Sequence, residues 1–296
     1  MNSVRPLVVE TLAEDAVARL RNEYQQGVQA RWQHILAGAD CPRPGRLEEI
    51  HKKLQRHSVV IIRGASGQGK SSLGWRFLFD YCADGLRFEI RLVDGREHAL
   101  RVANALRAHI HSLRLCAVVW LDLAPSDAGW FELLRELADA GLKVLVAVRE
   151  EDFRRAGASA DQLDYGEVTL DAVTAEEAEA IFTKLAKGAL GTTLDFADAW
   201  TRFGAADGGP LLEFTHLITQ GATLSEKLQN QVQRLQDEAA SGKLPITRKH
   251  LRALALAALA HSAGCRLDSS RLCAGWPGFL HMARSPCATA HPTVSP

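Results

Sequence analysis

Short apolar runs separated by helix-length segments dominate the middle of the chain. They lie at residues 59–62, 88–92, 117–121 and 144–148, with a weaker run at 167–170. The runs at 59–62, 117–121 and 144–148 are uninterrupted, which is typical of parallel strands that are covered on both faces. Because strands that alternate with helices favour βαβ units, the pattern predicts an α/β core over residues 42–171.

The part before this core, residues 1–41, has a helical pattern of its own. Apolar side chains recur at helical spacing over residues 12–37 and predict one or two helices. The glycines and prolines of residues 38–45 end this pattern, and a short helix follows at residues 46–55. The N-terminal segment carries no motif. It is either a brace that packs against the core or a piece that binds a partner.

After residue 171 the strand pattern stops. Thr174 is suited to cap a helix, and Glu176 and Glu177 place acidic side chains in its first turn. Further helical patterns cover residues 195–203, 210–219, 224–239 and 247–262. Residues 172–243 are therefore predicted to form a helical domain.

The last stretch of the chain, residues 274–296, has a different composition. It holds four of the ten prolines and no acidic residue, and no periodicity continues through it. This composition predicts a disordered tail, or an end unrelated to the preceding domain, such as a frameshifted one. A proline-rich docking tail is the alternative.

Charge and cysteine content narrow the classes of partner. The 35 basic and 35 acidic side chains give a formal net charge of zero, so nucleic acid and anionic membranes are not indicated. The chain contains no C-x-x-C pair, so a zinc cluster is not predicted. The N-terminus lacks the apolar region of a signal peptide, and residues 251–260 are too short to span a bilayer. A cytoplasmic protein without a membrane partner is expected.

A phosphate-binding motif of the form G-x-x-x-x-G-K-S stands between the first apolar run and a helical pattern. It consists of Gly64, Ala65, Ser66, Gly67, Gln68, Gly69, Lys70 and Ser71. Glycines let backbone N–H groups turn towards phosphate oxygens, and the following helix N-terminus adds partial positive charge. Lys70 is predicted to reach the β- and γ-phosphates and Ser71 to bind Mg²⁺. Ser72 is predicted to belong to the nucleotide-binding residues as well. A plain glycine turn with a surface lysine is the alternative.

The third apolar run ends in an acidic residue. Asp122 follows residues 117–121 directly, as in a Walker B motif, and is predicted to hold Mg²⁺ through water. An aspartate that merely ends a strand is the alternative. Leu123 comes next, so the usual position of a general base is not acidic. Hydrolysis of a bound triphosphate is therefore predicted to be slow.

The fourth apolar run ends in a basic residue, Arg149. An arginine at this strand end can point at the γ-phosphate and respond to its presence. The alternative is a solvated arginine that pairs with Glu150 or Glu151. The sequence leaves both roles open.

Together these motifs resemble the STAND NTPases, relatives of the AAA+ ATPases that include the NACHT and NB-ARC groups. The P-loop, Asp122 and Arg149 carry the resemblance. Two shorter matches add to it. The segment around Arg46 resembles the stretch that precedes the P-loop in this class and borders the adenine. The segment around Pro210 resembles the glycine-proline motif of the helical lid, whose proline packs near the base.

The resemblance covers residues 42–262 and implies a fold. It implies a five-stranded parallel core, then a helical lid over residues 172–243, then a winged-helix-like domain that residues 244–273 begin. Neither a full winged helix nor a repeat array fits before residue 274. The chain therefore resembles a truncated member of the class.

The resemblance also implies a function. ATP or ADP and Mg²⁺ would be the ligands of a regulatory switch, closed with ADP and open with ATP. Arg149 and Pro210 would couple the nucleotide to the placement of the domains. Self-association on activation and a role in signalling or defence complete the implied picture.

Other classes of function remain open. An AAA+-like motor or loader acting on nucleic acid or protein would need a strong general base beside Asp122, and Leu123 counts against it. A small-molecule or nucleotide kinase would need a substrate pocket and an arginine-rich lid. A scaffold that no longer binds nucleotide conflicts with the intact P-loop.

Overall fold

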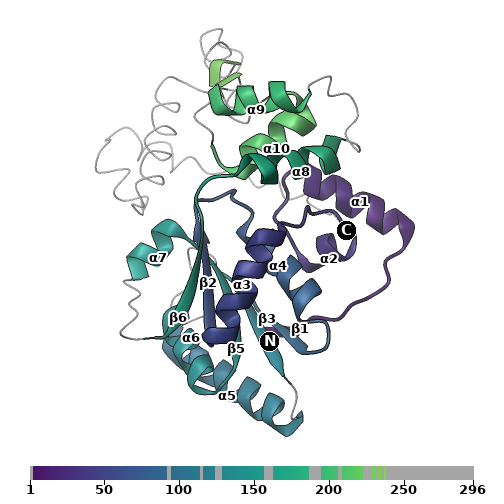
Figure 1. Ribbon diagram of the computed structural model, residues 1–296. Coiled ribbons are helices and arrows are strands. Elements are labelled where there is room, and N and C mark those ends of the chain that lie inside the picture. The colour runs from purple at the N-terminus through teal and green to yellow at the C-terminus, as the bar shows by residue number, and fades with distance from the viewer. Residues whose placement is uncertain are drawn as a thin grey trace, which may run out of the picture. The chain divides into compact units, whose positions relative to one another are not determined.

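The computed structural model describes most of the first three quarters of the chain (Figure 1). The described residues are 3–91, 95–113, 116–123, 129–156, 163–186, 195–205, 209–222, 229–230, 232–234 and 237. The chain divides into one compact unit at Met1–Lys227 and a second at Leu228–Pro296. In the second unit the described residues are helical. Residues 244–273, predicted to begin a winged-helix-like domain, and the predicted tail at residues 274–296 lie outside the described residues.

A six-stranded, mostly parallel sheet forms the centre of the first unit, with the strand order β1-β3-β4-β5-β2-β6. The strands are β1 (Val4–Pro6), β2 (Val59–Gly64), β3 (Leu86–Ile90), β4 (Ala117–Asp122), β5 (Lys143–Arg149) and β6 (Tyr165–Leu170). Strands β2 to β6 pair in parallel and correspond to the apolar runs. The predicted α/β class is therefore confirmed.

The sixth strand, β1, corrects the expectation of a five-stranded parallel sheet. It pairs antiparallel with β3, Val4 opposite Ile90 and Pro6 opposite Phe88. Its sequence of Val-Arg-Pro is too short for either a strand alternation or an apolar run to show. Pro6 is tolerated because β1 lies at the edge of the sheet, where one side of the strand needs no N–H donor.

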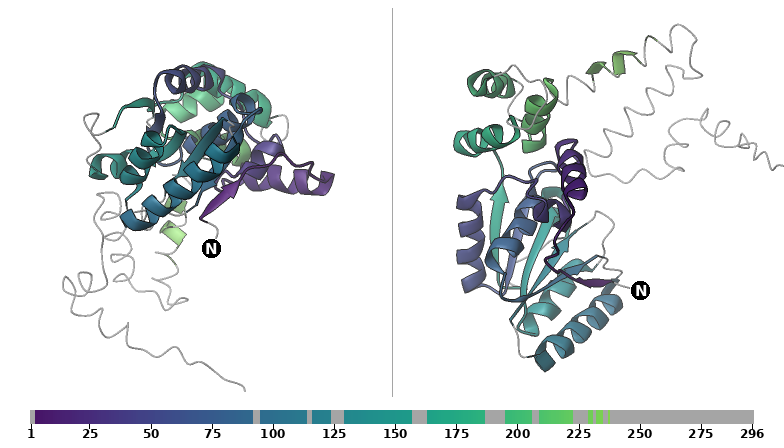
Figure 2. Two further views of the ribbon diagram at one scale, coloured as in Figure 1. Left: turned by 90° about the horizontal axis from the view of Figure 1, so that it is seen from below. Right: turned by 90° about the vertical axis from the view of Figure 1, so that its right-hand side faces the viewer.

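Helices cover both faces of the sheet (Figure 2). They are α1 (Glu14–Gln25), α2 (Trp32–Leu36), α3 (Pro44–Arg56), α4 (Lys70–Tyr81), α5 (Gly95–Leu113), α6 (Trp130–Asp139), α7 (Glu150–Ala156), α8 (Ala175–Ala186), α9 (Phe196–Ala205) and α10 (Leu211–Gln220). None of these helices is long and apolar enough to cross a membrane.

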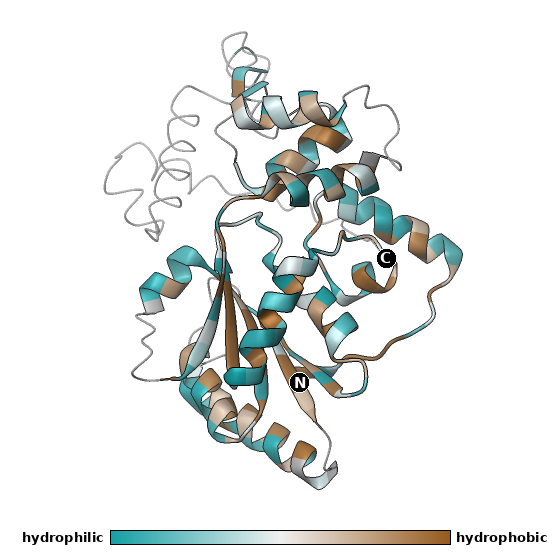
Figure 3. Cartoon of the chain, viewed as in Figure 1, coloured by the Kyte–Doolittle hydropathy of each residue, from teal (hydrophilic) through white to brown (hydrophobic). Residues whose placement is uncertain are grey.

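Neighbouring residues of one strand serve two different cores. Val59 and Ile61 of β2 pack in a core that includes residues of α5 and α6, whereas Val60 and Ile62 pack in a core that includes residues of α3 and α4. All four side chains are fully buried. This double burial explains why the strand is uninterruptedly apolar, as the brown central strands in Figure 3 show.

Helices α8, α9 and α10 pack around a separate apolar core. Ala178 of α8, Ala199 of α9 and Phe214 of α10 are fully buried in it. The predicted start of α8 is confirmed by a capping box: the Thr174 Oγ1 accepts from the Glu177 N–H at 3.2 Å, and the Glu177 carboxylate accepts from the Thr174 N–H at 3.4 Å. This helical group stands beyond the carboxyl ends of the strands (Figure 1).

The parallel strands bring the charged strand ends to one edge of the sheet. Strand β5 lies between β2 and β4, with Gly64 opposite Arg149 and Asp122 opposite Ala147. Ligands of open α/β sheets bind in the crevice outside the carboxyl ends of such strands. The fold therefore places the P-loop, Asp122 and Arg149 where a ligand can meet all of them.

Candidate functional site

The P-loop connects β2 to α4 and has the strand–loop–helix arrangement of a P-loop NTPase. Two of its glycines are required by geometry. A Cβ on Gly64 would lie 2.4 Å from the carbonyl oxygen of Leu170 in the neighbouring strand. Gly69 is the N-cap residue of α4 and has a left-handed φ of 76°. The loop is therefore shaped by its backbone, which leaves N–H groups at the start of α4 for a ligand.

Lys70 is the first residue of α4 and its side chain folds across the P-loop. Its Nζ donates to the carbonyl oxygens of Gly64 at 2.8 Å and Ala65 at 2.7 Å. Burial lowers the pKa of this ammonium group, and the nearby carboxylate of Asp122 opposes that shift. A buried ammonium group that already donates to two carbonyl oxygens is suited to donate a further hydrogen bond to an anionic phosphate oxygen.

Asp122 ends β4 beside the first turn of α4. Burial raises the pKa of its carboxyl group, while hydrogen bonds from Ser71 and Gln29 and the charge of Lys70 lower it. A hydroxyl and a carboxylate are oxygen ligands of the kind that Mg²⁺ prefers. Ser71 and Asp122 therefore fit a magnesium ion that accompanies a phosphate chain.

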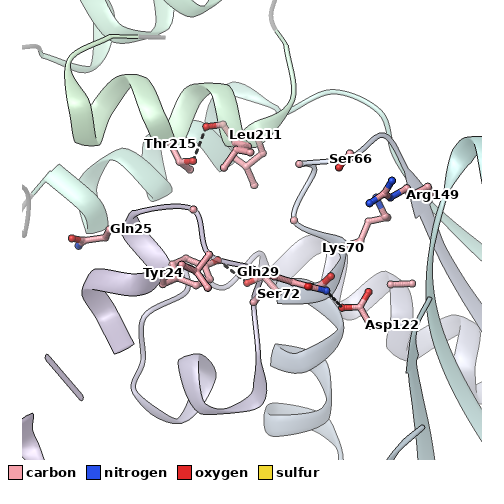
Figure 4. Close-up of a pocket in the computed structure, with 18 of the residues that line it drawn as sticks. Tyr24, Gln25, Gln29, Ser66, Lys70, Ser72, Asp122, Arg149, Leu211 and Thr215 are labelled. Atoms are coloured by element: carbon pink, nitrogen blue, oxygen red, sulfur yellow. Dashed lines mark hydrogen bonds between the residues drawn. The ribbon is translucent and has the colours of Figure 1, made fainter. Parts of the chain in front are cut away.

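Arg149 ends β5 and lines the same cavity (Figure 4). Its neighbour Glu150 is engaged elsewhere: both carboxylate oxygens accept from the Arg63 Nη1 at 2.8 Å, and one accepts from Arg154 at 2.8 Å. Within the described residues, Arg149 forms no ion pair with Glu150 or Glu151. Its guanidinium group is therefore available to a ligand in the cavity.

A cavity of about 370 Å³ joins these residues, a volume within the usual range of small-molecule sites. One wall is the P-loop with the ends of β4 and β5. The other walls are the turn between α1 and α2 and the helix α10. These walls contribute Tyr24, Gln25, Gly27, Val28, Gln29, Ala30, Leu211, Leu212, Thr215 and Thr219.

The N-terminal wall is the part of the site that the sequence pattern did not predict. The hydroxyl groups of Tyr24 and Ser72 are hydrogen-bonded at 2.8 Å, and the Gln29 Nε2 donates to Asp122 at 3.3 Å. Trp75 Nε1 donates to the carbonyl oxygen of Ala30 at 3.2 Å. No local signal could have indicated these contacts, because the paired residues lie 45 to 93 positions apart.

Helix α10 is hydrogen-bonded to the tip of the P-loop. The N–H of Leu212 donates to the carbonyl oxygen of Gly67 at 2.9 Å. The side chain of Gln68 links two further segments: its Nε2 donates to the Asp171 carbonyl oxygen at 2.6 Å, and its Oε1 accepts from the Leu211 N–H at 3.3 Å. The phosphate-binding loop and the helical group are thus in direct contact.

A second cavity of about 40 Å³ adjoins the first and shares Tyr24, Gly69 and Ser72 with it. Arg43 lines this smaller space and is 7% exposed. Its Nη2 is buried and has no hydrogen-bond partner among the described residues, and burial lowers the pKa of the guanidinium group. A buried donor beside the P-loop helix suits a polar ligand atom.

Arg46 and Pro210, which are predicted to border the base, lie outside the lining of the larger cavity, as do Gly64, Ala65 and Gln68 of the predicted nucleotide-binding set. Arg46 is in α3 and forms ion pairs with Glu49 and Glu177, both at 3.4 Å. Pro210 is the N-cap residue of α10, and its Cβ is 3.4 Å from the position that a Cβ on Gly67 would take. Their roles at a base remain predictions.

Comparisons with known proteins return distant structural similarities. A solved Walker-type ATPase of Pyrococcus abyssi is 15% identical with a TM-score of 0.42, and the match covers 82% of this chain and 89% of that chain. A chain from a structural study of katanin self-assembly is 11% identical with a TM-score of 0.40, covering 71% of this chain and 67% of that one. No protein-family model and no curated protein matches the sequence.

Proposed function

We propose that this chain binds Mg-ATP and ADP at the P-loop. Four features support the proposal. The loop backbone is shaped by Gly64 and Gly69, Lys70 lies across the loop, and Ser71 and Asp122 supply oxygen ligands for Mg²⁺. Arg149 adds a cation at the edge where the end of the phosphate chain would lie. Mg²⁺ would neutralise charge on the phosphates when bound.

We further propose that the chain works as a nucleotide-dependent switch of STAND type. The observation that carries this proposal is the bonding between the P-loop tip and α10, through Gly67, Gln68 and Leu212. A ligand that changes the loop backbone would change these bonds, and with them the preferred placement of the helical group. The proposal also includes self-association and a role in signalling or defence, and the resemblance to STAND NTPases is the sole support for these two parts.

The lining of the cavity supports slow rather than fast hydrolysis. Asp122 is the one acidic side chain among the described residues that line the cavity, and it is predicted to hold the metal ion. Leu123 follows, and its aliphatic side chain has no group that can accept a proton, so this position offers no base. A motor would need such a base, and the described residues favour a switch over it.

Nucleotide titrations of the wild-type protein and Lys70→Ala test the binding site. Loss of the buried ammonium group should weaken Mg-ATP binding by about 100-fold, because a charge-assisted contact to phosphate is lost. Lys52→Ala is the matched control, since Lys52 is an exposed lysine of α3 that pairs with Glu48. Equal affinity of wild type and Lys70→Ala would refute the proposed site.

The switch is tested in the same proteins by hydrogen exchange of the peptide that covers α10. We expect different protection of this peptide with ATP and with ADP. In Gln68→Ala the difference should shrink, because the links to Asp171 and Leu211 are lost while the P-loop glycines and Lys70 remain. Identical protection of α10 with both nucleotides in the wild type would exclude a switch that acts through this helix.

A further inference from the structure

The turn between α1 and α2 brings an amide side chain to the end of β4. Gln29 is exposed, lines the main cavity and donates from its Nε2 to the Asp122 Oδ2 at 3.3 Å (Figure 4). Within the described residues, the Gln29 side chain makes this one hydrogen bond. Its carbonyl oxygen, Oε1, is therefore available to accept one.

The position of Gln29 is set by contacts on both sides of it. Before it, Tyr24 is bonded to Ser72 at 2.8 Å, and Gly27 has a φ of 81° that brings its backbone close to Leu212. After it, the Ala30 carbonyl oxygen accepts from Trp75 at 3.2 Å. The turn is thus docked on α4 at two points. The amide group is held at Asp122 by the fold and not only by its own hydrogen bond.

Among the described residues that line the cavity, no acidic side chain other than Asp122 could orient the attacking water, and Asp122 is predicted to hold the metal ion. The Asp122 carboxylate also accepts a hydrogen bond from Ser71, and the next residue, Leu123, has an apolar side chain. A glutamine amide carries both N–H donors and a carbonyl acceptor on one rigid plane. With its Nε2 anchored on Asp122, Gln29 can direct Oε1 at a water molecule beside the terminal phosphate.

We propose that Gln29 is a positioning residue that orients the attacking water during hydrolysis, an inference that rests on the proposed function. The water oxygen forms a bond to the γ-phosphorus as the bond from that phosphorus to the β–γ bridging oxygen breaks. The electron pair of the broken bond leaves with ADP, one water hydrogen stays on the transferred oxygen, and the other passes as a proton to a phosphate oxygen of the product. The amide accepts a hydrogen bond from the water but takes no proton, which agrees with slow turnover.

The test compares Gln29→Ala with the matched control Gln26→Ala. Gln26 lies in the same turn, is exposed and bonds only to Asn22 within the described residues, and it does not line the cavity. Three quantities are measured for each protein: the rate of phosphate release, the affinity for Mg-ATP, and the affinity for Mg-ADP with aluminium fluoride. The last complex mimics the planar phosphoryl group with its attacking water, and it requires no turnover.

In Gln29→Ala we expect phosphate release to fall about tenfold or more, and the affinity for the aluminium fluoride complex to fall by a similar factor. The affinity for Mg-ATP should stay within about twofold, because the interaction is made with water in the transition state. The midpoint of thermal unfolding should not change, since the side chain is exposed. Gln26→Ala should match the wild type in all measurements.

Three outcomes would overturn the inference. Phosphate release in Gln29→Ala could equal that of the wild type. The affinities for Mg-ATP and the aluminium fluoride complex could fall equally, which would show ground-state binding only. The wild type could bind Mg-ATP in a Lys70-dependent manner yet release no phosphate. By contrast, Mg-ATP binding that is unaffected by Lys70→Ala would refute the proposed function itself, so the two failures are distinguishable.

Discussion

The two sides of the main cavity are built in different ways. Most of the P-loop wall comes from one stretch of sequence, since β2, the glycine loop and α4 follow one another over residues 59–81, and the ends of β4 and β5 join it through the pairing of the parallel strands. The opposite side comes from the turn after α1 and from α10. It meets the P-loop wall through hydrogen bonds such as Tyr24 with Ser72 and Leu212 with Gly67.

Under the proposed function, this difference separates the residues that would bind the nucleotide from those that would respond to it. The P-loop wall keeps its geometry for as long as the sheet is folded, because strand pairing and glycine backbone angles define it. A wall of distant segments can move without unfolding the sheet, since each neutral hydrogen bond contributes only about 1 kcal/mol. Substitutions in the first wall should therefore affect folding and phosphate binding, and those in the second should have smaller effects.

The largest effect is expected where α4 packs on β4. A Cβ on Gly74 would lie 2.1 Å from the ring of Trp120, which is fully buried. Gly74→Val should lower the free energy of unfolding by about 3 kcal/mol, because the ring and helix would have to separate. Urea unfolding of this variant measures the loss.

Gly45→Ala is the control for this helix substitution, because a Cβ there meets no atom within 4 Å. Its free energy of unfolding should stay the same or rise by up to about 1 kcal/mol. Equal stability of the two variants would show that the first wall is less closely packed than the structure indicates.

A smaller effect is expected where the two sides meet at the P-loop tip. Gly67 has a φ of 82°, and a Cβ on it would lie 3.0 Å from the Leu212 Cβ. Gly67→Ala should lower Mg-ATP affinity about tenfold, because the strained loop and the displaced α10 both disturb the N–H groups that face phosphate. Isothermal titration measures the change.

Gly141→Ala separates backbone strain from the contact with α10. Gly141 has a similar φ of 76°, but a Cβ on it meets no atom within 4 Å, and the residue lies in the turn before β5. We expect a comparable loss of stability and no loss of nucleotide affinity. If Gly141→Ala weakened binding as much as Gly67→Ala, the contact with Leu212 would not be the cause.

The smallest effect is expected at the N-terminal wall. Burial raises the pKa of Tyr24 to about 12, and the hydrogen bond with Ser72 lowers it in part. Tyr24→Phe should lower the free energy of unfolding by about 1 kcal/mol at neutral pH through loss of that hydrogen bond. Chemical unfolding at pH 7 measures this difference.

The same pair of proteins gives a pH test. The ordinary pKa of tyrosine is 10.0, so the folded protein holds the neutral phenol more strongly than the unfolded chain does. This stabilisation is complete below pH 10 and is lost as the pH rises towards 12. The wild type should therefore lose more stability than Tyr24→Phe over this interval. Parallel losses would mean that Tyr24 is not buried against α4.

Within the described residues, most strands and helices followed from local patterns, and β1 is an exception. The apolar runs located β2, β4 and β5 because a strand covered on both faces must be apolar at consecutive positions, whereas β3 and β6 alternate between buried and partly exposed residues and gave weaker patterns. Strand β1 left no such pattern, since three residues at a sheet edge carry little periodicity and depend on β3 for their partners. The helix that starts after Thr174 was predictable because its two capping residues, Thr174 and Glu177, lie three positions apart in sequence.

By itself, the sequence determined the phosphate-binding loop and the charged strand ends, because glycine angles, strand burial and the start of a helix are local properties. The tertiary structure decided which other residues share the cavity. Gln29 meets Asp122 across 93 positions, and Arg63 engages Glu150 across 87, which leaves Arg149 to face the cavity. Such contacts depend on how the chain packs around the sheet. No short stretch of sequence encodes them.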